Sequence, residues 1–127
     1  MVDPSKRYRI LIVEDEYYIA ADLEVALQSV GVEIVGPVCR LREALCQVAK
    51  ADFDAVVLDI NLQDECAYCV ADELTRRHIP FVFATGYSAE SIPSRFSDVK
   101  RFEKPYDVMG IARHVVQLCE ATARQPL

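Results

Sequence analysis

Short apolar runs alternate with longer amphipathic segments along the chain. Three of the runs, at residues 10–13, 55–58 and 81–84, contain no polar residue, a pattern typical of strands buried on both faces of a sheet. A weaker run at residues 32–38 is closed by Gly36 and Pro37, which favours a place near the edge of the sheet. A short piece at residues 100–103 completes five predicted strands.

Between the predicted strands, apolar residues recur at the 3.6-residue period of a helix. Four such stripes are present: Ile19, Leu23, Leu27 and Val30; Leu41, Leu45 and Val48; Cys66, Cys69, Val70 and Leu74; Met109, Ala112, Val115, Val116 and Cys119. The period is poor at residues 88–99, where Pro93 interrupts it, so we expect about one helical turn there. The alternation of strands and helices predicts one α/β domain with a parallel sheet.

Chemically active residues directly follow most of the predicted strands. They are Glu14, Asp15 and Glu16 after the first strand, Asp59 after the third, Thr85 after the fourth and Lys104 after the fifth. Ligands of open α/β sheets bind beyond the carboxyl ends of the strands, so these side chains are expected to converge. Clustered carboxylates repel one another unless a cation joins them, and hard oxygen ligands suit Mg²⁺. A central aspartate beside a lysine and a hydroxyl suits nucleophilic attack on a phosphoryl group.

Composition narrows the range of functions. The chain has 127 residues, the size of one domain, with 14 Lys and Arg against 20 Asp and Glu. The resulting charge of −6 disfavours broad contact with nucleic acid or anionic lipid. The five cysteines are odd in number and scattered, which indicates reduced thiols in a cytoplasmic protein. We expect Cys66 and Cys69 to pack in the core, because no second pair completes a metal site.

The residues at the strand ends resemble those of bacterial response-regulator receiver domains, and the resemblance extends from Ile10 to Cys119. It implies a flavodoxin-like fold, with a doubly wound five-stranded parallel sheet of order 2-1-3-4-5 and helices on both faces. It further implies that Asp59 is the phospho-acceptor, Thr85 the switch hydroxyl and Lys104 the family's lysine. The peptide bond between Lys104 and Pro105 is then expected to be cis.

The same resemblance implies a bound Mg²⁺ or Mn²⁺ ion. Its ligands would be Asp15, Asp59 and the backbone carbonyl of Asn61, with Glu14 contributing more weakly or through a water molecule. Gly86 and Tyr87 follow the switch hydroxyl and are expected close to the phosphoryl group, where Tyr87 either covers the acyl phosphate or packs at the rim of the site.

The chain also departs from the usual family pattern. Gln63 and Ala67 replace the usual proline and glycine after the acceptor, and Arg101 replaces the strand-five aromatic that partners the switch hydroxyl. Burial of an unpaired guanidinium is costly, so we expect Arg101 to stay at the surface. The string from residue 80 to residue 87, PFVFATGY, resembles the FATGUY subgroup of receivers, which is often stand-alone and linked to stress-response signalling.

The expected function is signalling. A histidine kinase or histidine phosphotransfer protein would phosphorylate Asp59, and a downstream protein would read the surface formed by residues 88–99, the fifth strand and the last helix. We expect a cytoplasmic monomer or weak dimer that binds neither nucleic acid nor membrane. It would be a single receiver domain over residues 1–127, with its core at 8–122 and no output domain. Slow self-dephosphorylation, rather than enzymatic turnover, is expected.

Three other functions use a similar fold. A phosphatase with an aspartate nucleophile typically has a second aspartate two residues further on, where this chain has Asn61. A flavin carrier needs a phosphate-binding loop after the first strand, where Glu14 and Asp15 would repel phosphate. A degenerate receiver would bind partners without phosphorylation, and only a phosphorylation assay separates it from an active one.

Overall fold

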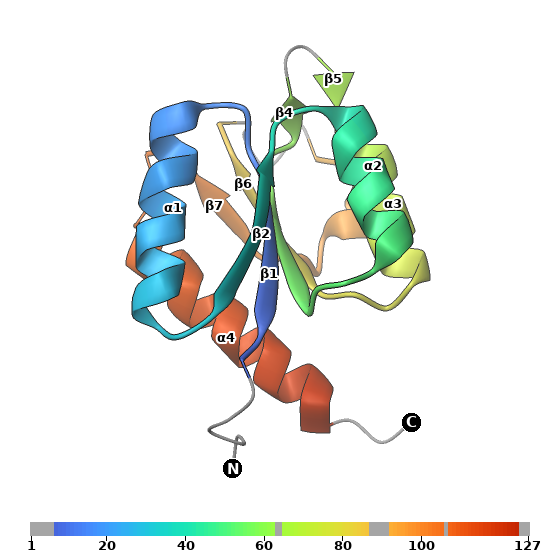
Figure 1. The fold of residues 1–127 in the computed structure, drawn as a ribbon. Helices are drawn as coiled ribbons and strands as arrows, with labels where there is room; N and C mark the ends of the chain where they lie inside the picture. Colours follow the sequence, from blue (N-terminus) through green and yellow to red (C-terminus); the bar gives the residue numbers. More distant parts are fainter. Residues whose placement is uncertain (1–6, 63–64, 87–91, 106, 125–127) are drawn as a thin grey trace.

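The architecture is a five-stranded parallel sheet with helices on both faces (Figure 1). This computed structural model describes residues 7–62, 65–86, 92–105 and 107–124. The sheet order is β2-β1-β3-β6-β7, which confirms the predicted order 2-1-3-4-5 for the five long strands. Their bounds are Glu33–Val38 (β2), Arg9–Val13 (β1), Ala55–Leu58 (β3), Phe81–Thr85 (β6) and Arg101–Glu103 (β7).

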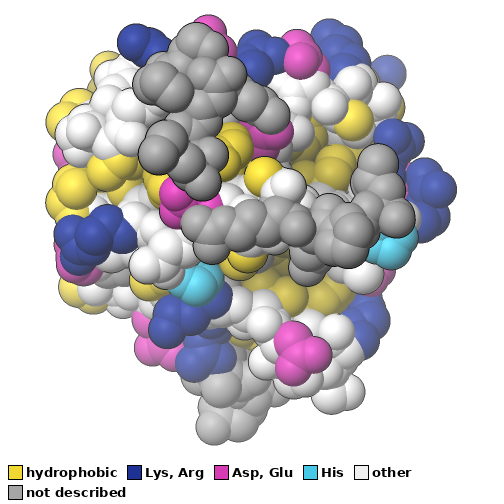
Figure 2. Space-filling view, turned by 90° about the horizontal axis from the view of Figure 1, so that it is seen from below, with side chains coloured by type: hydrophobic (Ala, Val, Ile, Leu, Met, Phe, Trp, Pro, Cys, Tyr) yellow, Lys and Arg dark blue, Asp and Glu magenta, His cyan; other side chains and the backbone are white. Residues whose placement is uncertain are grey.

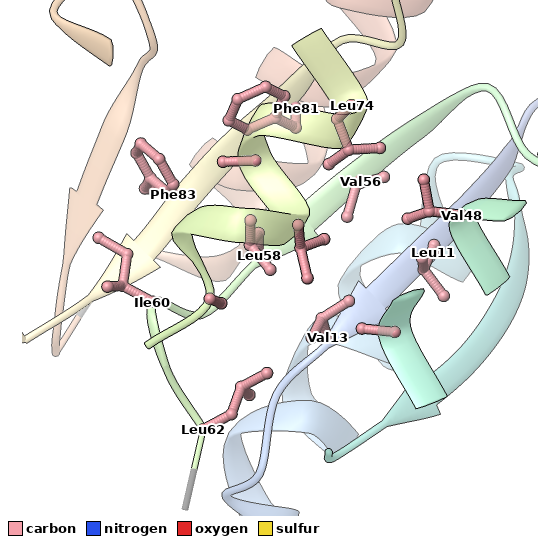
Figure 3. Close-up of a cluster of buried hydrophobic side chains, with 14 of the residues drawn as sticks. Leu11, Val13, Val48, Val56, Leu58, Ile60, Leu62, Leu74, Phe81 and Phe83 are labelled. Carbon is pink, nitrogen blue, oxygen red and sulfur yellow. The ribbon is translucent and has the colours of Figure 1, made fainter. Parts of the chain in front are cut away.

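The helices divide into two layers. Those of the first layer are α1 (Tyr17–Ser29) and α4 (Val108–Arg124); those of the second are α2 (Leu41–Lys50), α3 (Tyr68–Arg76) and the 3-10 turn η2 (Ser94–Phe96). Because successive strand residues point to opposite faces, Ile10 and Ile12 pack in the core under the first layer. Leu11 and Val13 pack under the second (Figure 3). No helix in the described part of the chain is long and apolar enough to cross a membrane.

A small hairpin lies between the third strand and the third helix. It consists of β4 (Asn61–Leu62) and β5 (Glu65–Cys66), paired antiparallel. The hairpin uses residues that the sequence pattern assigned to the third helix, so α3 begins only at Tyr68. Its buried stripe is Val70, Ala71 and Leu74, and the Cys69 thiol lies at the surface. The prediction that Cys69 packs in the core is therefore wrong.

Strand β2 lies at one edge of the sheet, as its weak pattern predicted, but it runs through Gly36 and Pro37 instead of ending there. Gly36 has a φ of +88°, and a Cβ at this position would lie 2.9 Å from the backbone nitrogen of Val38. The pairing register with β1 is irregular across the same stretch. Glycine is needed here both for its backbone conformation and for the close approach of the chain.

The poorly periodic segment forms one short 3-10 turn in its described part, residues 92–99, as predicted. Its anchor is Phe96, which is 3% exposed. The Phe96 ring stacks on Tyr68 of α3 with centroids 5.6 Å apart and meets the edge of Phe83 of β6 at 5.5 Å. Phe96 thus anchors this segment in the core, and an ion pair between Arg95 and Asp72 at 2.9 Å also ties it to α3.

Candidate functional site

Two buried carboxylates form the centre of the site at the carboxyl ends of β1 and β3. Glu14 is 3% exposed and Asp59 is 1% exposed. The Glu14 N–H donates to the Val38 carbonyl at 3.0 Å, and the Asp59 N–H donates to the Val13 carbonyl at 2.8 Å. These bonds continue the ladders of the sheet, so both backbones are held by neighbouring strands. Carboxylate oxygens of Glu14, Asp59 and the half-buried Asp15 lie within 4.8 Å of one another.

Both oxygens of Asp59 are engaged. Oδ1 accepts a hydrogen bond from the Asn61 N–H at 3.1 Å, and Oδ2 accepts one from Lys104 Nζ at 3.2 Å. Burial raises the pKa of Asp59, while hydrogen bonds from these partners and from Glu14 act in the opposite direction. Asp59 is thus a buried nucleophile candidate whose negative charge is partly compensated.

Glu14 holds a proton more tightly than an ordinary glutamate. Burial raises its pKa to about 8, and the adjacent Asp59 carboxylate adds to the effect through a hydrogen bond and its charge. The Glu16 N–H donates to Glu14 Oε2 at 3.1 Å. This bond lowers the pKa of Glu14 but does not offset the larger effect of burial. A proton on Glu14 in turn favours the ionised form of Asp59, because the hydrogen bond from Glu14 lowers the pKa of Asp59.

Lys104 reaches into the site from the end of β7. The backbone N–H of Lys104 donates to the Thr85 carbonyl at 2.9 Å, which holds the residue at the end of β6. Its Nζ lies 2.7 Å from Glu16 Oε1, 3.2 Å from Asp59 Oδ2 and 3.4 Å from Glu14 Oε2. Although burial lowers the pKa of Lys104, the three carboxylates outweigh it and raise that pKa above its usual range.

The contact between Glu16 and Lys104 was not predicted. The sequence places Glu16 in an acidic run after the first strand, but that run alone assigns it no partner. In the structure it is the carboxylate that lies nearest to the ammonium group. The presence of a third acid in the run was the only available signal.

The remaining predicted residues surround this centre. Thr85, fully buried, ends β6, and Gly86 beside it has open space where a Cβ would stand. Asn61 is exposed at the start of β4. The peptide bond between Lys104 and Pro105 is cis. Tyr87 lies outside the described residues.

Arg101 is less exposed than the sequence indicated. Its side chain is 27% exposed and pairs with Glu103 of the same strand at 3.0 Å. The Nε atom is buried and has no hydrogen-bond partner among the described residues. The expectation that Arg101 stays at the surface is therefore correct only for the part of the guanidinium that pairs with Glu103.

The donor set fits a divalent cation. Oxygens of three carboxylates lie within 4.8 Å of one another, and burial raises the pKa of both Glu14 and Asp59, so an added positive charge would favour their ionised forms. Hard oxygen donors with open positions are the arrangement that Mg²⁺ prefers. Lys104 supplies only one positive charge against several neighbouring carboxylates, so a second positive charge would still be compensated.

Comparison with known proteins gives one family. Residues 10–103 match the family model of the response regulator receiver domain. The sensory transduction protein LytT of Bacillus anthracis is 31% identical over 103 residues, covering 78% of this chain and 42% of LytT. LytR of Staphylococcus saprophyticus is 28% identical over 117 residues, covering 89% of this chain and 46% of LytR. The chain thus spans less than half the length of these relatives.

Solved structures agree with this match. SdrG from Sphingomonas melonis Fr1 is 41% identical, with a TM-score of 0.77, covering 90% of this chain and 97% of that one. Its BeF3-activated conformation, also 41% identical, has a TM-score of 0.70. A receiver domain protein from Methanospirillum hungatei JF-1 shares the fold with a TM-score of 0.81 at 21% identity, covering 95% of this chain and all of that one.

Proposed function

The chain belongs to the response regulator receiver domain family, and from this premise we propose that Asp59 is its phosphoryl acceptor. The observation that carries the proposal is the buried Asp59 carboxylate, held between the Asn61 N–H and the Lys104 ammonium at the end of the central strand β3. Receiver domains take phosphoryl groups from histidine kinases, and we propose a histidine kinase or a histidine phosphotransfer protein as the donor here.

The transfer requires an ionised Asp59. One carboxylate oxygen attacks phosphorus, the new O–P bond forms and the N–P bond of the phosphohistidine breaks. The imidazole keeps the proton on its other nitrogen and leaves as a neutral ring. Lys104 neutralises charge on the incoming oxygens, and the Thr85 hydroxyl donates a hydrogen bond to one of them.

A Mg²⁺ or Mn²⁺ ion would be held by Asp15, Asp59 and the Asn61 carbonyl, with Glu14 contributing more weakly. When bound, the ion supplies positive charge for the phosphoryl oxygens. Asp15 is the half-buried carboxylate of this set, placed within 4.8 Å of the carboxylate oxygens of Glu14 and Asp59. Replacement of Asp15 by Asn should therefore weaken Mg²⁺ binding in a calorimetric titration.

We further propose a place within the family. The PFVFATGY string resembles the FATGUY subgroup, and the 41% identity to SdrG, which has also been solved in a BeF3-activated conformation, supports a phosphorylation-dependent switch. With Arg101 in the usual aromatic position, we propose that the response runs through residues 85–99, β7 and α4.

Residues 1–127 would act as one receiver unit. The free thiols of Cys46 and Cys69 lie at the surface, which favours a reducing cytoplasm as the location.

Intact mass measurement with acetyl phosphate and Mg²⁺ tests the proposal. One phosphoryl group should be added to the wild-type protein and to Asp22→Asn, a control that removes an exposed carboxylate of α1. Asp59→Asn should gain none. An Asp59→Asn protein that is phosphorylated as well as wild type would contradict the assignment, and a wild-type protein that stays unmodified would favour a degenerate receiver.

A further inference from the structure

A groove opens at the end of the sheet opposite to Asp59, and we call it the basal groove. It has a volume of about 980 Å³ and lies between the end of α3, the starts of β6 and β7 and the second half of α4. Its walls include apolar side chains from three of these elements, namely Ile79, Pro80, Phe81, Val99 and Leu118. Its volume lies in the range of small-molecule sites, which are mostly apolar with a few convergent polar groups.

Four of the side chains that line the basal groove are basic. They are His78, Lys100, Arg101 and His114, against a single carboxylate, Asp98. This is the reverse of the whole chain, whose net charge is −6. Figure 2 views this end of the molecule and shows both histidines with Lys and Arg side chains beside them. With histidines counted as neutral, as in that net charge, Lys100 and Arg101 against Asp98 leave the groove lining with a net charge of +1 (2 − 1).

The ring of His114 holds a proton less readily than an ordinary imidazole. Burial lowers the pKa of His114, and the charge of Lys100 lowers it further. A bound anion would act in the opposite direction and favour the protonated ring.

Arg101 supplies a hydrogen-bond donor that the protein itself does not use. Its terminal nitrogen pairs with Glu103, while its buried Nε has no partner among the described residues. A buried donor without an acceptor is rare in native proteins, because leaving it unpaired costs free energy. Because this nitrogen is buried, an anion in the groove would pair with the Arg101 guanidinium only after that side chain shifts.

The turn after α3 places the His78 imidazole at the groove. His78 has a φ of +59°, and Ala51 at the end of α2 has a similar φ of +51°. The His78 N–H donates to the Thr75 carbonyl at 3.1 Å, so the turn is well formed.

We propose that the basal groove binds a small amphiphilic anion. Its phosphate or carboxylate group would lie among Lys100, Arg101 and the two imidazoles, and its apolar or aromatic body would lie on Phe81 and Leu118 with their apolar neighbours. This site is separate from the acceptor site. The proposal does not depend on Asp59 being the acceptor.

The histidines make the test specific, because the chain contains only two and both line the groove. Phenyl phosphate is the probe, followed by the imidazole signals in ¹H–¹³C NMR spectra. Both signals should shift in a saturable manner at millimolar concentrations, and the pKa of His114 should rise, because a bound anion favours the protonated ring. Benzyl alcohol, which lacks the charge, and inorganic phosphate, which lacks the ring, should both bind more weakly.

Charge variants fix the position of the bound anion. Lys100→Gln should weaken phenyl phosphate binding about two- to fivefold, as expected for a solvent-exposed charge, and Asp98→Asn should strengthen it. Arg113→Gln, which removes a charge of α4 outside the groove, and Asp59→Asn should leave it unchanged. Unmoved imidazole signals, unchanged binding in Lys100→Gln, or loss of binding in Asp59→Asn would each overturn the proposal.

Discussion

Lys104 contacts three carboxylates, and the shortest contact is with the most exposed of them. The Glu16 side chain is 58% exposed, whereas those of Glu14 and Asp59 are almost fully buried. In the proposed reaction the ammonium group must turn toward the incoming phosphoryl oxygens. Glu16 therefore competes with the substrate for Lys104.

Replacement of Glu16 by Gln should accelerate phosphorylation by acetyl phosphate. An exposed ion pair contributes little, so the increase should be about two- to fivefold. The rate is measured from the growth of the phosphorylated mass, with Asp22→Asn as the control for loss of a surface carboxylate. An unchanged or slower rate in Glu16→Gln would show that this contact does not restrain Lys104.

The raised pKa of Glu14 predicts how stability depends on pH. Because the folded protein holds this proton up to about pH 8, while the ordinary pKa is 4.5, the unfolded chain releases it first. The free energy of unfolding of the metal-free protein should then fall between these pH values, by up to about 1.4 kcal/mol per pH unit. Glu14→Gln should remove this fall and be more stable than wild type at pH 8.

Urea denaturation in EDTA between pH 5 and pH 9 measures both proteins, and their difference isolates Glu14 from the other titrating groups. The exposed Glu43 offers the matched control, because Glu43→Gln should follow the wild-type curve. A Glu14→Gln curve that runs parallel to wild type would contradict the assignment of the proton to Glu14.

At this scale the sequence predicted which residues meet, but not all of their contacts. The convergence of Glu14, Asp59 and Lys104 could be predicted because parallel strands place their carboxyl ends at one edge. The pairing of Glu16 with Lys104 depends on side-chain rotamers that no sequence pattern records. The burial of the Arg101 Nε atom depends on side-chain rotamers in the same way.

Among the elements, burial on both faces made the central strands predictable. The runs that became β1, β3 and β6 contain only apolar residues over most of their length, a pattern with no polar alternation to confuse it. The hairpin of β4 and β5 was missed because strands of two residues show no period. Its presence moved the start of α3 to Tyr68 and left Cys69 exposed.

The turn in β2 provides a prediction at the same scale. Gly36→Ala should lower the free energy of unfolding by about 2 kcal/mol or more, because it combines a positive φ with a Cβ placed 2.9 Å from the Val38 nitrogen and 3.1 Å from the Ile12 carbonyl. Gly31 is the matched control, since it has the same φ of +88° but open space around it. Gly31→Ala should cost only about 1 kcal/mol. Equal losses in chemical denaturation would show that the close approach does not matter.

In the whole molecule, the sheet separates two hydrophobic cores, one on each face, and the site lies at the carboxyl ends of its strands. Phe83 and Phe96 belong to the core under α2 and α3. Phe83 lies two residues before Thr85 on β6. β6 pairs with β7, where Thr85 lies opposite Glu103. A change at Thr85 can therefore reach both β7 and the segment anchored by Phe96.

Amide hydrogen exchange of the free and BeF3-treated protein tests this route. Exchange should change in residues 92–99 and in β7, because the segment rests on one aromatic anchor and few buried residues. Helices α1 and α2 should change little and serve as internal controls. Changes confined to α1 and α2 would show that the signal leaves the site by another path.

The irregular edge strand also affects how copies of the chain meet. An exposed edge offers unpaired N–H and carbonyl groups on which another strand can build, and this is a common start of aggregation. In β2, Pro37 has no N–H to offer, and Gly36 takes the chain out of regular register just before it. Only residues 33–35, beginning with the charged Glu33, keep a regular pairing edge. Within the described part of the chain, β2 thus offers only a three-residue stretch on which another copy could pair regularly.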